Sequence, residues 1–277
     1  MDEQALAAVE IRAINSINHI SESDRGAVVV ASSHGGLYSA YKAVTAGVRA
    51  VILSDAGGGL EDAGIASLEF CGSYGIPAAV VSHMSARIGD VADMRARGII
   101  SKSNAAAGAL GIVAGMTCSQ AISLFAAAPP TAPATPGEVA ETRHEELLVE
   151  GTAPVICIDS ASLIRDEDAG RIVITGSHGG LIGGDPAKAI NVACAFAAFN
   201  DAGVGIDEAG TGRLKPLDER GIAAVTVGHM SARIGDGRST LRQGIITHAN
   251  SAAIAMGARP GVALSEMLSA WLVANRN

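Results

Sequence analysis

The 277-residue sequence has few aromatic and few charged side chains: 3% of its residues are Phe, Trp or Tyr, and 17% are Asp, Glu, Lys or Arg. About a quarter of the residues of an ordinary soluble domain are charged, so this chain is short of charge. Because aromatic side chains are few, we expect a core of small aliphatic side chains. The hydrophobic content of 48% excludes a disordered acidic chain. Acidic residues outnumber basic ones by 28 to 20 and no basic stripe occurs, so no nucleic-acid partner is expected.

The four cysteines form no C-x-x-C pair, which gives no support to zinc-ribbon or thioredoxin-type chemistry. The first residues, MDEQALAAVEIRA, lack the apolar segment of a signal peptide, and we predict a cytoplasmic protein. The uncharged run 105–128 is long enough to span a bilayer. It contains three glycines and several polar residues, so we expect buried helices and no membrane partner.

Motifs that announce an enzyme class are also missing from the sequence. No G-x-S-x-G elbow, P-loop, H-E-x-x-H helix or EF-hand loop occurs. SHGGLYSA lacks the G-x-G-x-x-G fingerprint, so no nicotinamide cofactor is expected. No cofactor is predicted, although a divalent metal stays open.

An internal repeat is the main positive feature of the sequence. SHGGL occurs at 33–37 and again at 177–181, and HMSARIGD occurs at 83–90 and again at 229–236. SDAGGGLEDAG (54–64) and NDAGVGIDEAG (200–210) align between them, and GIISKSNAAA (98–107) aligns with GIITHANSAA (244–253). An eight-residue identity at matching places predicts a tandem duplication.

The repeat predicts two Rossmann-like α/β lobes with mainly parallel sheets, related by a pseudo-twofold axis. We predict a first lobe at 1–128, a proline-rich linker and connecting helix at 129–150, and a second lobe at 151–277. Near-continuous apolar runs suit strands that are covered on both faces. The predicted strands are 26–32, 48–54, 76–82 and 98–101 in the first lobe, and 171–176, 192–199, 222–228 and 244–247 in the second. The predicted helices are 36–46, 58–73, 103–127, 138–150, 185–191, 213–220 and 250–274.

Each repeated polar block follows a predicted strand, so the blocks are expected to meet at one edge of each sheet. In SHGG, glycines with positive φ would expose backbone N–H groups to an oxyanion, beside a serine and a histidine. A tight turn with a capping serine is the structural alternative. These residues are Ser33, His34, Gly35 and Gly36, with Ser177, His178, Gly179 and Gly180 in the second lobe.

The other blocks add carboxylates, imidazoles and guanidinium groups. Asp55 and Asp201 could orient a histidine or hold a metal, or form an Asx-turn. Arg87 and Arg233 are clamps suited to a carboxylate, or partners in an Arg–Asp ion pair or a lobe–lobe contact. The remaining candidates are His83, Asp90 and Asn104 in the first lobe and His229, Asp236 and Asn250 in the second.

This set of groups suits acid–base chemistry on a small anionic carbonyl compound. A hydrolase of an amide, lactam or ester is the first hypothesis, with His178 as base, Asp201 orienting it, Gly179 and Gly180 as oxyanion donors and Arg233 holding a carboxylate. An isomerase or lyase acting next to a carbonyl would use the same groups. A metal-dependent hydrolase with two histidines and one aspartate per lobe is a further alternative. A non-catalytic ligand- or nucleotide-binding module, and a homo-oligomer, stay open as well.

Overall fold

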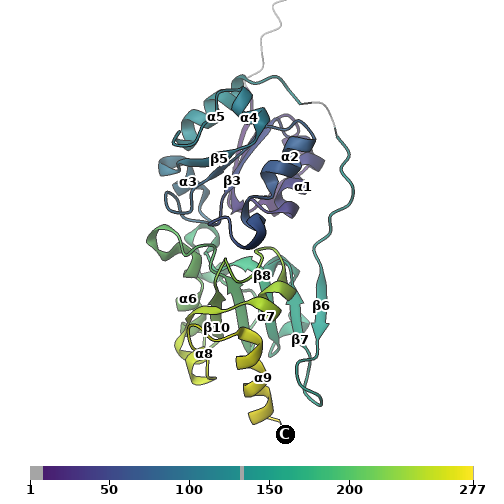
Figure 1. The fold of residues 1–277 in the computed structure, drawn as a ribbon, viewed down its shortest axis with the longest axis vertical. Helices are drawn as coiled ribbons and strands as arrows, with labels where there is room; N and C mark the ends of the chain where they lie inside the picture. Colours follow the sequence, from purple (N-terminus) through teal and green to yellow (C-terminus); the bar gives the residue numbers. More distant parts are fainter. Residues whose placement is uncertain (1–8, 132–133, 277) are drawn as a thin grey trace, which may run out of the picture.

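The computed structural model describes residues 9–131 and 134–276, and contains two sheets stacked along the long axis of the molecule (Figure 1). The first half, before strand β6, holds a five-stranded sheet of order β1-β2-β3-β4-β5. The second half, from β6 onward, holds a six-stranded sheet of order β11-β10-β9-β8-β7-β6. The first-half strands are β1 (Ile11–Ile14), β2 (Val28–His34), β3 (Ala50–Ser54), β4 (Ala78–Val81) and β5 (Ile100–Ser103). The second-half strands are β6 (Arg143–Glu146), β7 (Val155–Ile158), β8 (Ile172–His178), β9 (Phe196–Asn200), β10 (Ala223–Val227) and β11 (Ile246–Ala249).

Helices cover both faces of each sheet. Side chains of β2 alternate between two apolar clusters, with Val29 packed on the side of α1 and α2 and Val30 on the side of α3, α4 and α5. The helices are α1 (Leu37–Ala46), α2 (Ser67–Ser73), α3 (Val91–Arg97), α4 (Ala105–Ala109) and α5 (Cys118–Ala127), then α6 (Leu214–Glu219), α7 (Gly237–Gln243), α8 (Ser251–Ala255) and α9 (Leu264–Ala274). Burial on both faces explains why the central strands read as continuous apolar runs. The chain is therefore a mixed α/β protein with mostly parallel sheets, as the sequence predicts.

The last strand of each half runs against its neighbour. β5 pairs antiparallel with β4, and β11 pairs antiparallel with β10. The residues that follow these strands therefore lie at the opposite edge of the sheet from the residues that follow the parallel strands. Only three of the four repeated polar blocks in each half can share one edge, which corrects the expectation of four.

The segment expected to be a linker and a charged helix is partly a strand. Residues 138–150 contain β6, which pairs antiparallel with β7 at the edge of the second sheet. Its sequence RHEE has no apolar side chain, and an ion pair between Arg143 and the buried Asp168 fixes it instead. Strands β1, β6 and β7 were not predicted. The predicted helix at 185–191 contains only a short 3-10 helix, Pro186–Lys188.

The two long apolar helices expected near the end of each half are both interrupted. The run 103–127 divides into α4 and α5 because Gly111 and Gly115 adopt positive φ between them. The run 250–274 divides into α8 and α9 at Gly257 and Gly261, which also adopt positive φ. Within the described residues, no helix combines the length and the apolar character that crossing a bilayer requires.

Candidate functional site

The HMSARIGD segment of each half packs on the aspartate turn of the other half. The carbonyl of His83 accepts the N–H of Ile206 at 2.9 Å, and the carbonyl of His229 accepts the N–H of Leu60 at 2.8 Å. A Cβ atom on Gly203 would lie 2.9 Å from Cδ2 of His83, and one on Gly57 would lie 2.9 Å from Cδ2 of His229. Glycine at these turns is therefore needed for the close approach of the two halves.

Asp55 and Asp201 orient the histidines of this contact. Oδ1 of Asp55 lies 2.9 Å from Nδ1 of His83, and Oδ1 of Asp201 lies 3.2 Å from Nδ1 of His229. Burial would raise the pKa of both aspartates, but hydrogen bonds from the histidine ring and from backbone N–H groups bring each pKa below its ordinary value. Asp201 therefore holds His229, and not His178 as the sequence hypothesis required.

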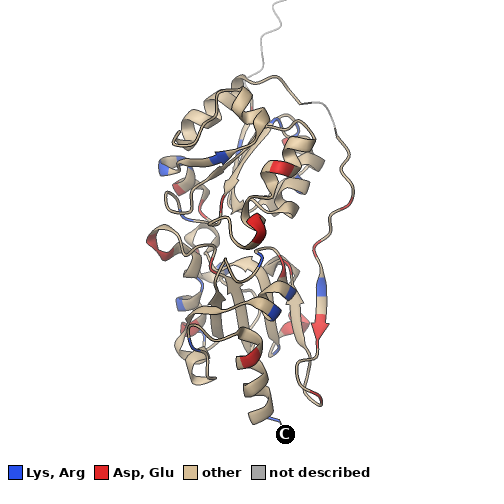
Figure 2. Cartoon of the chain, viewed as in Figure 1, with Lys and Arg blue, Asp and Glu red and all other residues tan. Residues whose placement is uncertain are grey.

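The repeated arginines form ion pairs across the same contact. Arg87 pairs with Asp90 and Asp93 in its own half and, at 3.1 Å, with Asp207 of the other half. Arg233 pairs with Glu61 of the first half. Figure 2 shows acidic and basic residues on both sides of this junction. Arg87 therefore acts as an ion-pair partner in a contact between the halves, as one of the structural alternatives expected. Arg233 makes such an ion pair as well, but it also lines the cavity described below.

Asp90 and Asp236 cap helices. The side chain of Asp90 accepts the N–H of Asp93 at the start of α3, and that of Asp236 accepts the N–H of Ser239 at the start of α7. An aspartate at this position is a common helix cap. Their repetition is accounted for by the repeated helix start, although Asp236 also lines the cavity.

Asn104 and Asn250 lie at the far edge of their sheets, away from the other repeated blocks. Oδ1 of Asn250 accepts the N–H groups of Ala224 and Ala253, each at 2.9 Å, and Nδ2 donates to the carbonyl of Ile222 at 2.8 Å. Asn104 makes the corresponding bonds in the first half. Both amides satisfy buried backbone groups, so the substrate-binding role expected for them is not supported by their place in the fold.

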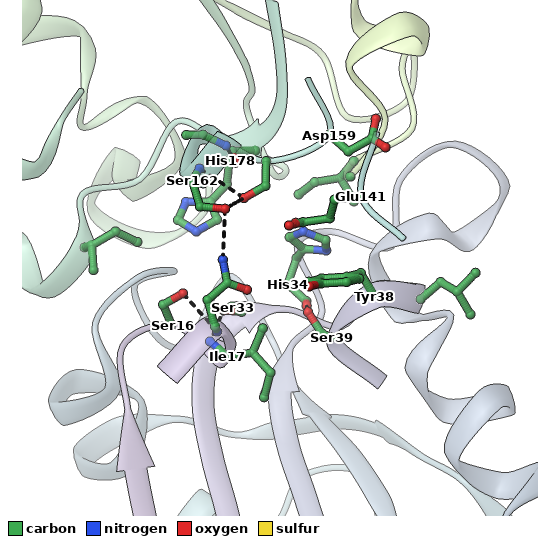
Figure 3. Close-up of a pocket in the computed structure, with 18 of the residues that line it drawn as sticks. Ser16, Ile17, Ser33, His34, Tyr38, Ser39, Glu141, Asp159, Ser162 and His178 are labelled. Atoms are coloured by element: carbon green, nitrogen blue, oxygen red, sulfur yellow. Dashed lines mark hydrogen bonds between the residues drawn. The ribbon is translucent and has the colours of Figure 1, made fainter. Parts of the chain in front are cut away.

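A cavity of about 1020 Å³ lies between the two halves. The carboxyl ends of β2 and β8 contribute Ser33, His34, Ser177 and His178, and loops before them contribute further hydroxyl and amide groups. Figure 3 shows His34, Tyr38 and Glu141 on one side of the cavity and His178 on another. The structure therefore brings the serine and histidine of both SHGG blocks to one cavity, and leaves Asp55, Asp201, His83 and His229 outside its lining.

Each cavity histidine is fixed by a backbone N–H group. Nδ1 of His34 accepts the N–H of Gly36 at 3.2 Å, and Nδ1 of His178 accepts the N–H of Gly180 at 3.1 Å. An N–H group can only donate, so Nδ1 carries a lone pair and Nε2 carries the proton of the neutral ring. Each ring therefore offers an N–H donor at Nε2, and no lone pair there to act as a base.

The SHGG glycines serve close packing instead of oxyanion binding. The N–H of Gly35 donates to the carbonyl of Ser54 and that of Gly179 to Asn200, both at 2.8 Å. Gly36 and Gly180 donate to the histidines, so all four N–H groups are engaged. Gly36 has a φ of −75°, contrary to the positive φ expected. A Cβ on Gly179 would lie 2.3 Å from the carbonyl oxygen of Gly210, which explains glycine there without a ligand.

Ser33 and Ser177 each accept a backbone hydrogen bond. Oγ of Ser33 accepts the N–H of Ile17 at 2.9 Å, and Oγ of Ser177 accepts the N–H of Ala161 at 2.8 Å. Among the described residues, neither hydroxyl is hydrogen-bonded to an imidazole. The contact between nucleophile and base that activates a serine is therefore not made in this conformation.

Burial keeps both cavity histidines neutral. Burial lowers the pKa of His34 from 6.5 to about 4. For His178, burial and the charge of Arg213 lower the pKa well below its usual range. At neutral pH both rings are therefore uncharged hydrogen-bond donors, a state in which an imidazole can polarise a carbonyl group.

These pKa shifts predict a loss of stability in acid. Between pH 6.5 and 4, an unfolded chain takes up a proton at His34 that the folded chain does not, so the free energy of unfolding falls as the pH falls. From the His34 pKa of about 4, we expect a loss of about 2 kcal/mol between pH 7 and pH 4.5. Urea unfolding at the two pH values measures it. His34→Gln should lose measurably less over this interval than the wild type, and equal losses in both proteins would contradict the assignment.

The sequence hypotheses missed a carboxyl group in the cavity, that of Glu141. Burial, the largest influence, raises the pKa of Glu141, the Asp159 carboxylate adds to the rise, and Ser160 and Lys42 oppose it only in part. Glu141 also helps to raise the pKa of Tyr38, after burial. Two residues of the sequence could have pointed here: Asn15 and Asp159 occupy matching places directly after strands β1 and β7, and both line the cavity.

The residues proposed as metal ligands are divided between two places. His34 and His178 lie in the cavity, whereas the aspartates and the other histidines lie at the junction of the halves. In the described part of the chain, no group of three or more His, Cys, Asp or Glu side chains is arranged to hold a metal ion. Comparison with models of protein families, with curated proteins and with solved structures found no match to this chain.

Proposed function

We propose that the chain is an enzyme that moves a proton at a carbon next to the carbonyl group of a small anionic substrate, as an isomerase or a lyase does. Glu141 is the general base, and His34 and His178 are neutral donors to the carbonyl oxygen. The observation that carries the proposal is the pair of imidazoles with Nδ1 bound to a glycine N–H, in one cavity with a carboxyl group of raised pKa.

The chemistry of these groups is complementary. The Glu141 carboxylate takes the proton from carbon, and the electrons of the C–H bond move toward the carbonyl oxygen. That oxygen becomes an enolate, which Nε2–H groups of the imidazoles stabilise by hydrogen bonds. In an isomerase the enolate is conjugated with an adjacent C=C bond, and Glu141 returns the proton to the far carbon of that bond as the carbonyl re-forms. In a lyase the enolate re-forms the carbonyl, the bond to a group on the next carbon breaks, and Glu141 gives the proton to that departing group. A carboxyl group whose pKa is raised by burial is suited to this exchange near neutral pH.

Hydrolysis is the second candidate function. A cavity of about 1020 Å³ has room for water beside a small substrate. Glu141 could activate that water, and the imidazoles would then stabilise the oxyanion of an amide, lactam or ester in place of the glycine N–H groups. This version of the hydrolase hypothesis needs neither Ser33 nor Ser177 as a nucleophile.

We also infer that the two halves arose by tandem duplication. Hydrogen bonds recur between matching residues: Ser33 with Ile17 and Ser177 with Ala161, and His34 with Gly36 and His178 with Gly180. The contacts of His83 with the second half and of His229 with the first are likewise reciprocal. A pseudo-twofold relation between the halves would account for two imidazoles that enter one cavity from β2 and β8.

Isotope exchange separates these functions. The protein is incubated in D₂O with a panel of small keto acids, hydroxy acids, lactams and amides, and the products are followed by proton NMR. We expect enzyme-dependent replacement of hydrogen by deuterium at the carbon next to a carbonyl. Release of an acid with ¹⁸O from labelled water, without carbon exchange, would favour hydrolysis. Thermal stabilisation by a compound that is never altered would favour a non-catalytic binding module.

A further inference from the structure

Arg213 is a buried guanidinium that the sequence hypotheses left aside. It is 4% exposed and lines the cavity. Its Nε donates to the carbonyl of Gly180 at 3.0 Å, its Nη1 donates to the carbonyl of Ala189, and its Cζ lies 5.1 Å from the centre of the Phe199 ring. Within the described residues its Nη2 makes no hydrogen bond, so N–H donors remain available on the cavity lining.

Arg213 has no counterion among the described residues. Burial lowers the pKa of Arg213 to about 10, and in the described part of the chain no carboxylate forms an ion pair with it. The group stays protonated at neutral pH. The other cations of the cavity lining are paired, Lys188 with Asp185 and Arg233 with Glu61. A buried, charged guanidinium without a counterion is unfavourable unless a ligand supplies the opposite charge.

This cation occurs in only one of the two halves. The residue that matches Arg213 in the repeat is Ser67. Both residues bind an SHGG glycine through the backbone: the N–H of Ser67 donates to the carbonyl of Gly35, and the N–H of Arg213 donates to the carbonyl of Gly179, each at 2.8 Å. Oγ of Ser67 is buried and has no hydrogen-bond partner in the described structure. At this matching position the two halves therefore differ by one positive charge.

We propose that Arg213 forms an oxyanion subsite at the His178 end of the cavity, which binds the carboxylate or phosphate group of a small ligand. The free guanidinium N–H groups donate to the anion, whose charge offsets that of Arg213. The orientation that follows rests on the proposed function: the anionic group lies beside Arg213, and the reacting carbonyl lies between the imidazoles of His178 and His34, on the side of Glu141.

Thermal denaturation with simple anions tests the subsite. Wild type, Arg213→Met and Arg220→Met are melted at constant ionic strength with acetate, malonate or inorganic phosphate, and with acetamide as a neutral analogue. Arg220 is the matched control, because it is exposed and donates to the carbonyl of Ile190 without lining the cavity. We expect at least one anion to raise the melting temperature of wild type and Arg220→Met, and acetamide to have no effect. Calorimetry should give at least tenfold weaker binding of that anion to Arg213→Met. Acetate or malonate as the stronger ligand would identify a carboxylate, and phosphate would identify a phosphate.

Two results would overturn the subsite. One is the absence of any anion effect on the wild type, and the other is an equal effect in Arg213→Met. If Arg213→Met does not fold, NMR titration of His178 in the wild type replaces it: a bound anion beside Arg213 should raise the pKa of His178, and an unchanged titration at saturating anion counts against the proposal. Glu141→Gln should bind the anion like the wild type, so loss of the subsite and loss of the proposed reaction are distinguishable.

Discussion

Glu141→Gln should lower kcat by about 10²- to 10⁴-fold, the range expected when a general base is removed. The amide keeps the size of the carboxyl group but cannot take a proton from carbon. Because the carboxyl group lies where burial disfavours its charge, the neutral amide should leave the melting temperature close to that of the wild type. Deuterium exchange into the substrate, measured by NMR, reports the loss directly.

Glu145→Gln is the matched control for this change. Glu145 lies on β6, four residues further along the same segment, where it is exposed and 3.7 Å from Arg171. We expect its kcat to stay within twofold of the wild type. The pH profile gives a second test: activity of the wild type should fall as the pH drops through the raised pKa of Glu141. If Glu141→Gln keeps wild-type activity, Glu141 is not the base.

Asn250→Ala should lower the free energy of unfolding by about 3 kcal/mol or more, because several buried backbone groups lose their partners together. Oδ1 accepts two N–H groups and Nδ2 donates to two carbonyls, those of Ile222 and Leu214. Urea unfolding measures the change. KM should not rise in the protein that remains folded, because Asn250 lies at the edge of the sheet away from the cavity.

Asn275→Ala is the control for the loss of an amide. Asn275 is exposed, and its Nδ2 donates to the carbonyl of Trp271 at the end of α9. We expect its stability to change by less than about 0.5 kcal/mol, as for ordinary surface substitutions. The opposite pattern for Asn250→Ala, a protein of normal stability with a strongly raised KM, would restore the ligand-binding role that the repeat first implied.

Much of the fold follows from periodicity and repetition. The apolar runs of β2, β3 and β4 and their counterparts were predicted within a few residues, because burial on both faces leaves a plain signal. Strand β6 gave no such signal, since RHEE is held by Arg143 and by pairing with β7. The direction of β5 and β11 could not be read either, because the pattern of one strand does not tell which way its neighbour runs.

Part of the cavity lining was predicted, for a different reason. His34 and His178 were identified because they repeat after strands that end at one edge. His83 and His229 repeat just as strictly, yet they join the halves. Repetition marks a residue that is needed twice, whether in the cavity or in a contact between halves. Neither Glu141 nor Arg213 has an identical residue at the matching position of the other half, so the repeat could not identify them.

The place of Glu141 in the chain links the reaction to the position of the two halves. Its neighbour Thr142 donates its N–H to Oδ2 of Asp159 at 2.7 Å, and the carbonyl of Thr142 accepts the N–H of Asp159 at 3.1 Å. These two bonds attach the segment that carries Glu141 to the second half. His34 and Tyr38 belong to the first. If the halves separate to admit a substrate, the carboxyl group of Glu141 moves away from the imidazole of His34 in the same movement. Proton removal would then be confined to the closed form, in which a reactive enolate is shielded from bulk water.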